Sequence, residues 1–276
     1  MRKLIAVLLL VLTWSAIGFA ATRIVYENFE TVTYLNSSGG DTAFDAIGRA
    51  VYERGEVTTD NPSPGSGSKN ARARICLTST CGSDTTMPTF QKMNMSVGSE
   101  IYVSFYVRIG SDLSNEFSAL KLVDINDNGG DDQTGYWVEP EWYGNTSSPE
   151  IYFYSNENNG TPTWQSCNIN FDDVKDTWLK VEVYVKSQTG SSNNGIVRVW
   201  FTPAGGSRTL EFELTNVRWG TSTRNWKFVG APHHCYIGGY SNTDGHIQID
   251  DIEIWDGMPT EEHLRPDSPK GLRIIG

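Results

Sequence analysis

The segment Ile101–Ile109, "IYVSFYVRI", decides the fold because its apolar residues recur at every second position. Tyr102, Ser104, Tyr106 and Arg108 occupy the positions in between. Successive residues of a β-strand face opposite sides of a sheet. The segment is therefore predicted to be a strand with one face in a core.

The same alternation recurs in several other segments. They read "WLKVEVYVK" (178–186), "GIVRVWF" (195–201), "RTLEFEL" (208–214) and "HIQIDDIEIW" (246–255). Turn-forming clusters such as "NPSPGSGSKN" and "SQTGSSNNG" separate the strands, and no amphipathic helix is predicted after residue 20. Many strands joined by Gly-rich turns predict an all-β protein, an antiparallel β-sandwich of the jelly-roll type.

The two ends of the chain differ from this pattern. Residues 1–20 combine Arg2 and Lys3 with an apolar run and small residues before Ala21, which predicts a cleaved signal peptide and a secreted protein, extracellular or periplasmic. No later segment is long and apolar enough to predict a membrane span. We expect one sandwich domain over residues 21–257 and a Pro-rich tail over residues 258–276.

The charge of the chain limits its partners. The formal net charge is −11, and removal of Arg2 and Lys3 with the signal peptide gives −11 − 2 = −13. Such an acidic protein is not expected to bind nucleic acid or anionic membranes.

Four cysteines in an exported chain predict disulfides. Cys76 and Cys81 are close enough in sequence for a local bridge, which would leave Cys167 to pair with Cys235. Other pairings stay open.

The last predicted strand contains a break in its alternation. The apolar series passes from Ile249 to Ile252, a step of three instead of two. One extra residue at Asp250 and Asp251 would restore the phase, so a β-bulge is predicted there, with two adjacent carboxylates near a sheet edge.

The segments "YENFE", which ends at Glu30, and "IDD", which ends at Asp251, resemble paired motifs of secreted carbohydrate-active jelly rolls. In those proteins the two motifs often hold a structural calcium ion. The resemblance implies a Ca²⁺ site with Glu30 and Asp250 or Asp251 as ligands, completed by backbone carbonyls.

The order of the predicted strands, from "IYVSFYVRI" through "FSALKLVDIN" to "GHIQIDDIEIWDG", is similar to that of the concanavalin A-like lectin/glucanase superfamily. The nearest likeness is to its polysaccharide lyase-like and laminin-G-like members. This resemblance implies a protein that binds polysaccharide on a concave sheet lined with aromatic side chains.

The aromatic content suits such a surface, because aromatic rings stack on the C–H faces of sugars. The chain has nine Trp and twelve Tyr residues, several of them at outward positions of strands. Trp137, Tyr143 and Trp200 are candidate carbohydrate-binding residues. The alternative is that some of these rings are buried in a second packed face.

Two candidate sets of catalytic residues follow from the chemistry. Hydrolysis of a glycan needs two carboxylates, and Glu139 and Glu141 lie two residues apart on a strand predicted from Trp137 to Tyr143, although Pro140 between them marks an edge or a bulge. A lyase needs a base such as Tyr or His and a cation that neutralises a uronate carboxylate. The lyase candidates are His233, His234, Tyr236, Tyr240, Arg72, Arg74 and Lys121. The Arg-Glu-Leu-Arg and Gln-Ile-His motifs of alginate-lyase-like relatives are absent.

These features predict a protein that binds glycans. If it is an enzyme, lyase activity is the first expectation and glycoside hydrolysis the second. The alternative is a structural or adhesive extracellular sandwich that self-associates through the tail by strand addition. The segment Asp124–Asp132 matches the first half of an EF-hand loop but has Gly135 at the twelfth position, so a polar hairpin is favoured over a calcium loop.

Overall fold

The computed structural model describes most of the chain. The described residues are 20–35, 40–48, 55–65, 67–75, 89–112, 117–129, 136–138, 140–143, 150–153, 163–166, 169, 174–232, 234–237 and 245–264. In these ranges no helix is long and apolar enough to cross a membrane.

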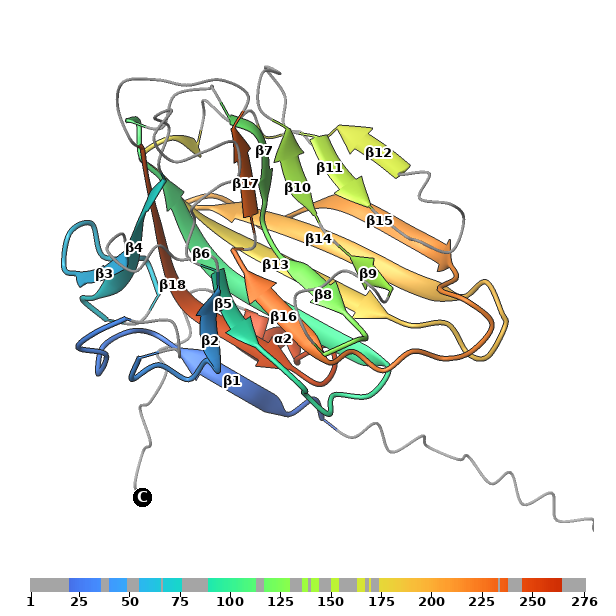
Figure 1. Cartoon of the computed structure of the whole chain (residues 1–276). Helices are drawn as coiled ribbons and strands as arrows, with labels where there is room; N and C mark the ends of the chain where they lie inside the picture. The colour runs from blue at the N-terminus through green and yellow to red at the C-terminus, as the bar shows by residue number, and fades with distance from the viewer. Residues whose placement is uncertain are drawn as a thin grey trace, which may run out of the picture.

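One layer of the protein is an eight-stranded antiparallel sheet, which we call the large sheet (Figure 1). Its strands are, in spatial order, β15 (Thr209–Val217), β14 (Gly195–Pro203), β13 (Trp178–Lys186), β6 (Glu100–Ile109), β18 (Gly245–Trp255), β4 (Asn70–Ile75) and β3 (Gly55–Thr58), and β1 (Arg23–Glu27) also pairs with β18. The five segments with clear alternation all form strands of this sheet, as predicted.

The second layer is divided into short strands, and we call it the segmented sheet. Its five-stranded part runs β2 (Ala46–Gly48), β5 (Thr89–Lys92), β16 (Phe228–Ala231), β8 (Asp124–Asn126) and β9 (Trp137–Val138). Its three-stranded part runs β10 (Glu141–Tyr143), β7 (Phe117–Lys121) and β17 (His234–Ile237), and β11 (Glu150–Phe153) pairs with β12 (Thr163–Ser166). In Figure 1, β7 leads into β8 and β16 into β17, so the two parts continue one another.

The main core fills the space between the two layers. From β6, the residues at the predicted inward positions, such as Val103 and Phe105, are fully buried, and Leu120 and Ile125 from the segmented sheet pack into the same cluster. Full burial of each such side chain stabilises the fold by about 1.5–3 kcal/mol. The prediction of an all-β, antiparallel sandwich of the jelly-roll type is confirmed.

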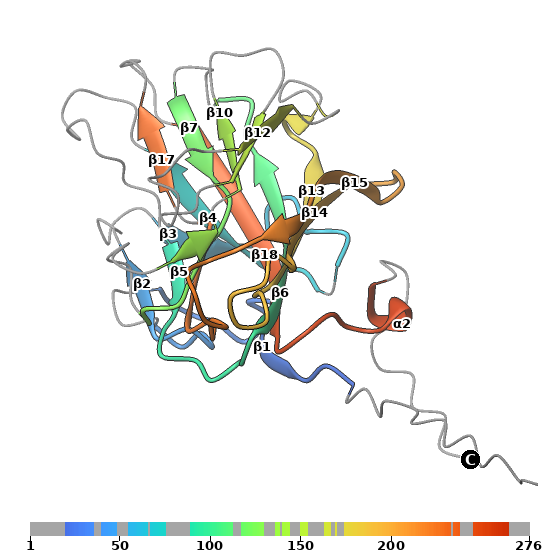
Figure 2. The ribbon, with the colours of Figure 1, turned by 90° about the vertical axis from the view of Figure 1, so that its right-hand side faces the viewer.

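The outer face of the large sheet carries a second, smaller apolar cluster. Its members are Tyr102, Tyr184, Trp200, Trp255 and Leu264, with Met258 packed against them. Leu264 ends the short helix α2 (Glu261–Leu264), which lies on the side of the large sheet away from the segmented sheet (Figure 2). The part of the expected tail that is described, residues 258–264, therefore packs on the sandwich. Residues 265–276 lie outside the described ranges.

The predicted bulge in the last strand is confirmed. The pairing of β18 with β6 shifts between Asp250 and Glu253. Asp251 has a φ of 47°, in the left-handed region that a bulged residue can adopt. Both aspartates are almost fully buried.

Candidate active site

Three residues that are far apart in the sequence meet in one row of the segmented sheet. Lys121 of β7 lies directly opposite Glu141 of β10 on one side and His234 of β17 on the other. Directly opposite residues of antiparallel strands have Cβ atoms about 4.5–5.5 Å apart. The register therefore brings together a lysine, a glutamate and a histidine that are separate candidates in the sequence.

The next row on the same face is aromatic. Ala119 of β7 lies opposite Tyr143 of β10 and opposite Tyr236 of β17. Because residues two apart on a strand share a face, these positions adjoin the row of Lys121. The small Ala119 separates the two tyrosine positions.

This face is the one that turns away from the core. Leu120 and Leu122, on either side of Lys121, belong to the main core, so Lys121 is on the opposite side of the sheet. Its side chain is nonetheless only 7% exposed. A largely buried lysine in register with a glutamate and a histidine is therefore a candidate functional residue.

Polar residues continue this face along β8. Asp124 and Asn126 flank the core residue Ile125 and are fully buried, and Asn126 Nδ2 donates to Asp124 Oδ2 at 3.1 Å. Asp124 lies opposite Gly230, which in turn lies opposite the buried Gln91 of β5. We call this surface, from Gln91 to the row of Lys121, the polar face of the segmented sheet.

Sequence reasoning missed the contribution of β8 to the polar face. It placed Asp124 and Asn126 at the end of the predicted strand "FSALKLVDIN" and considered them only as calcium ligands, whereas the alternation in "DIN" was the signal that both side chains share one face of that strand. The two arms of the predicted hairpin are present, because β8 pairs with β9 and the backbone amide of Asp127 donates to the carbonyl of Tyr136 at 3.1 Å, while residues 130–135, with Asp132, lie outside the described residues.

The other predicted site residues of this layer are described only in part. Trp137 lies opposite Asn126 in the register of β9. Glu139, His233 and Tyr240 lie outside the described residues. The strand expected to run from Trp137 to Tyr143 is interrupted, since Pro140 separates β9 from β10 and its carbonyl accepts a hydrogen bond from the amide of Leu122.

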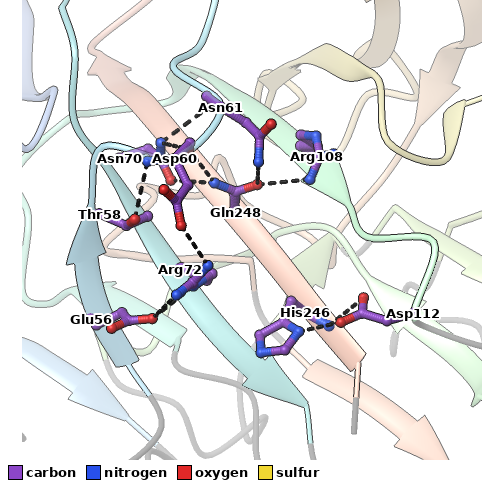
Figure 3. Close-up of polar contacts among 10 residues, drawn as sticks. All are labelled: Glu56, Thr58, Asp60, Asn61, Asn70, Arg72, Arg108, Asp112, His246 and Gln248. Carbon is purple, nitrogen blue, oxygen red and sulfur yellow. Dashed lines mark hydrogen bonds and ion pairs between the residues drawn. The ribbon is translucent and has the colours of Figure 1, made fainter.

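Arg72, Arg74 and Trp200 lie on the large sheet and not on the polar face. Arg72 of β4 forms ion pairs with Glu56 and Asp60 (Figure 3). Arg74 lies opposite His246 in the register of β18. These candidates thus belong to a different face of the molecule from Lys121.

Trp200 is buried in the apolar cluster on the outer face of the large sheet. The guanidinium of Arg208 stacks on its ring, 4.2 Å from the centroid. Trp200 and its neighbours Tyr102 and Tyr184 are therefore buried in a second packed face. For these three residues this alternative holds, and not the expected exposure to a sugar.

The predicted calcium ligands are near one loop. The Ser63 hydroxyl donates to Asp250 Oδ2 at 2.7 Å, and the Tyr26 hydroxyl donates to Asp251 Oδ1 at 2.7 Å. Gly65 lies so close that a Cβ there would fall 1.4 Å from Asp251 Oδ2. The loop backbone is thus packed directly on the bulged carboxylate.

Glu30 contacts the same loop from the other side. The backbone amides of Ser68 and Lys69 each donate to Glu30 Oε1 at 2.6 Å. A Cβ on Gly67, which has a φ of 128°, would lie 2.2 Å from that oxygen. Burial, with smaller contributions from the charges of Asp251 and Glu30, raises the pKa of Asp250 to about 8.

In the part of the chain that the structure describes, no three His, Cys, Asp or Glu side chains converge closely enough to form a metal site by themselves. Of the cysteines, only the backbone of Cys235 falls within the described ranges, so the predicted disulfides stay predictions.

Neither a protein-family model nor a curated protein matches the sequence. Solved structures do match. The PL-14 alginate lyase from Aplysia kurodai superposes with a TM-score of 0.61 and 13% identity, over 85% of this chain and 99% of that one. The endo-β-1,4-glucuronan lyase from Trichoderma reesei gives 0.59 and 16% identity, over 90% and 100%.

A mutant of the alginate lyase Aly36B, solved in complex with alginate tetrasaccharide, gives a TM-score of 0.57 and 18% identity, over 88% of this chain and 98% of that one. All three proteins are polysaccharide lyases by name. The predicted resemblance is confirmed at the level of the fold: this chain has the concanavalin A-like jelly roll that these lyases share.

Proposed function

We propose that the protein binds uronate-containing polysaccharide on the polar face of the segmented sheet and cleaves it by β-elimination. The observation that supports this most directly is the cross-strand row of Lys121, Glu141 and His234 beside the two tyrosine positions. The fold adds support, because the solved structures that superpose over most of the chain include lyases of alginate and glucuronan.

The residues on this face match what β-elimination requires. A base removes the proton at C5 of a uronate, the electrons form the C4–C5 double bond, and the C4–O bond breaks as its oxygen takes a proton from an acid. We assign Lys121 to neutralise the uronate carboxylate, which stabilises the charge that develops at C5. Tyr236 and His234 would supply the groups that accept and donate protons.

The acidic net charge of the chain does not prevent this assignment. A charge near the reacting group acts at short range, whereas distant surface charges are screened over about 8 Å at physiological ionic strength. A largely buried Lys121 therefore influences a bound carboxylate more than the overall charge of −11 does.

The assignment predicts ultraviolet-absorbing products from acidic polymers only. The purified protein is expected to produce the absorbance of an unsaturated uronate from alginate, glucuronan or polygalacturonate, and none from a neutral β-glucan. New reducing ends without this absorbance would indicate hydrolysis instead. Binding without any cleavage would indicate a lectin, and the absence of both would contradict the proposed function.

We further propose that the protein acts outside the cytoplasm. The support is the signal-like composition of residues 1–20.

We also propose a structural Ca²⁺ ion held by Glu30 and by Asp250 or Asp251, with backbone carbonyls completing its ligands. The close packing of Gly65 and Gly67 on these carboxylates and the like charges around Asp250 support it, because a cation would offset the repulsion. The ion would fix the loop between β3 and β4 to the bulge of β18.

Calcium is accordingly expected to raise the unfolding temperature, and EDTA to lower it. At a concentration about a hundred times its dissociation constant, a ligand that binds only the folded state stabilises it by about 2.7 kcal/mol. The variant Asp251→Asn should lose most of this response, whereas Asp112→Asn, at an exposed position, should keep it. An identical melting curve with and without Ca²⁺ would refute the proposal.

A further inference from the structure

The outer face of the large sheet contains a lysine, Lys180, that has no polar partner among the described residues. In β13 the residues Leu179 and Val181 point into the main core, so Lys180 between them faces outward. Its side chain is only 8% exposed. Across the described ranges, the ammonium of Lys180 makes no hydrogen bond and no ion pair.

The nearest neighbours of Lys180 add a hydroxyl group to this position. Lys180 lies directly opposite Tyr106 of β6 and Thr202 of β14. Both neighbours are at most 8% exposed. Within the described residues the hydroxyl of Thr202 also has no partner. An ammonium and a hydroxyl that can both donate hydrogen bonds thus lie side by side.

The acidic groups around Lys180 do not compensate its charge. Glu182, two residues further on the same face, is fully buried and accepts hydrogen bonds from Arg208 Nε at 2.9 Å and from the hydroxyl of Tyr102. Among the described residues Glu182 forms its ion pair with Arg208, and Lys180 forms none with it. Lys180 thus has no counter-ion in the part of the chain that the structure describes, so an anion that binds there would form a new charge-assisted hydrogen bond.

Aromatic rings border the same position. Trp178 precedes Lys180 on the same face, and its indole nitrogen is fixed by a hydrogen bond to the carbonyl of Asn61 at 3.0 Å. Trp200 lies diagonally across from Lys180 on β14, but its ring is packed in the outer apolar cluster and against Arg208, so Trp178 is the ring that a ligand beside Lys180 would contact. Rings beside a cation suit a sugar that carries a negative group.

We propose that Lys180, Thr202 and Trp178 form a second glycan-binding site that takes the carboxylate of a uronate residue. Lys180 and Thr202 donate hydrogen bonds to the carboxylate, and the edge of the Trp178 ring contacts the sugar. This site lies on the large sheet, opposite to the polar face, and it does not depend on the activity proposed above.

A second site of this kind would hold a polymer that the polar face also engages. Two linked contacts raise the effective concentration of the chain at the protein, so weak individual binding is sufficient. The narrow exposure of Lys180 and Thr202 indicates a site for one sugar residue and not for a long oligosaccharide.

The test uses the whole protein with ¹⁵N-labelled tryptophan and sodium glucuronate as the probe. The indole signal of Trp178, assigned from Trp178→Phe, is expected to shift as glucuronate is added. Lys180→Met should raise the dissociation constant at least about tenfold, since hydrogen bonds to charged groups are the strong ones. Lys180→Arg, which keeps the charge, should retain measurable binding.

The controls show whether the response needs both the carboxylate of the sugar and the ammonium of Lys180. Glucose, which lacks the carboxylate, should cause no shift, and Lys121→Met should leave the Trp178 response unchanged. A response that persists in Lys180→Met, or that glucose reproduces, overturns the proposal. If sulfate alone gave the same shift at the same concentration, the assignment to a sugar would be wrong.

Discussion

Replacing Lys121 by methionine is expected to reduce β-elimination at least about a hundredfold, because loss of one group that stabilises developing charge usually has this effect. The methionine is similar in length and apolar, so it fills the space of a side chain that is only 7% exposed. The measurement is the initial rate of product absorbance on the best uronate polymer, together with a thermal unfolding curve.

The matched control is Lys92→Met on β5 of the same sheet. Lys92 forms an ion pair with Asp45 at 2.8 Å, and its side chain is 24% exposed. Its removal should leave the rate within about a factor of two, because Lys92 alternates with Gln91 along β5 and so does not lie on the polar face. If Lys121→Met unfolded with the wild-type profile and kept its rate, Lys121 would not be the neutralising group, and the roles proposed for the polar face would have to be reassigned.

The fold could be predicted from the sequence because the strands of the large sheet have strict alternation. The segment 178–186 is predicted to be a strand and is β13 over those same residues. The bulge at Asp250 and Asp251 was also predictable, since one extra residue must appear where the apolar phase changes.

The candidate site was predictable only as separate residues. The chemistry of Lys121, Glu141, His234 and Tyr236 singles out each of them, but their meeting in adjacent rows depends on strand order in a sheet. Alternation tells which face of a strand a residue occupies, and it does not tell to which sheet the strand belongs. For that reason the sequence groups Arg72 with residues that lie on the other layer.

Buried polar residues were the least predictable feature. Glu182 and Lys180 have outward positions on β13 and would be expected in water, yet both are nearly fully buried. The burial of Glu182 arises because Trp200 lies opposite it on β14 and Tyr102 of β6 donates a hydrogen bond to it, both within the apolar cluster that residues 258–264 help to cover. Such covering by distant segments leaves no signal in the local sequence.

The ion pair between Arg208 and the buried Glu182 should be important for stability. Replacing Arg208 by methionine is expected to lower the free energy of unfolding by about 3–5 kcal/mol, because it leaves Glu182 charged and fully buried without its counter-ion. The same change removes the guanidinium that stacks on Trp200. Chemical unfolding by urea, followed by tryptophan fluorescence, measures the loss.

Arg198 provides the matched comparison on the same sheet. Its ion pair with Glu213, at 2.6 Å, joins two side chains that are 36% and 39% exposed. Arg198→Met should therefore cost no more than about 1 kcal/mol. Adding Glu182→Gln to Arg208→Met should restore part of the lost stability, since the buried charge is then removed. Equal losses for the Arg208 and Arg198 variants, or no recovery in the double variant, would show that the buried charge of Glu182 does not determine the effect.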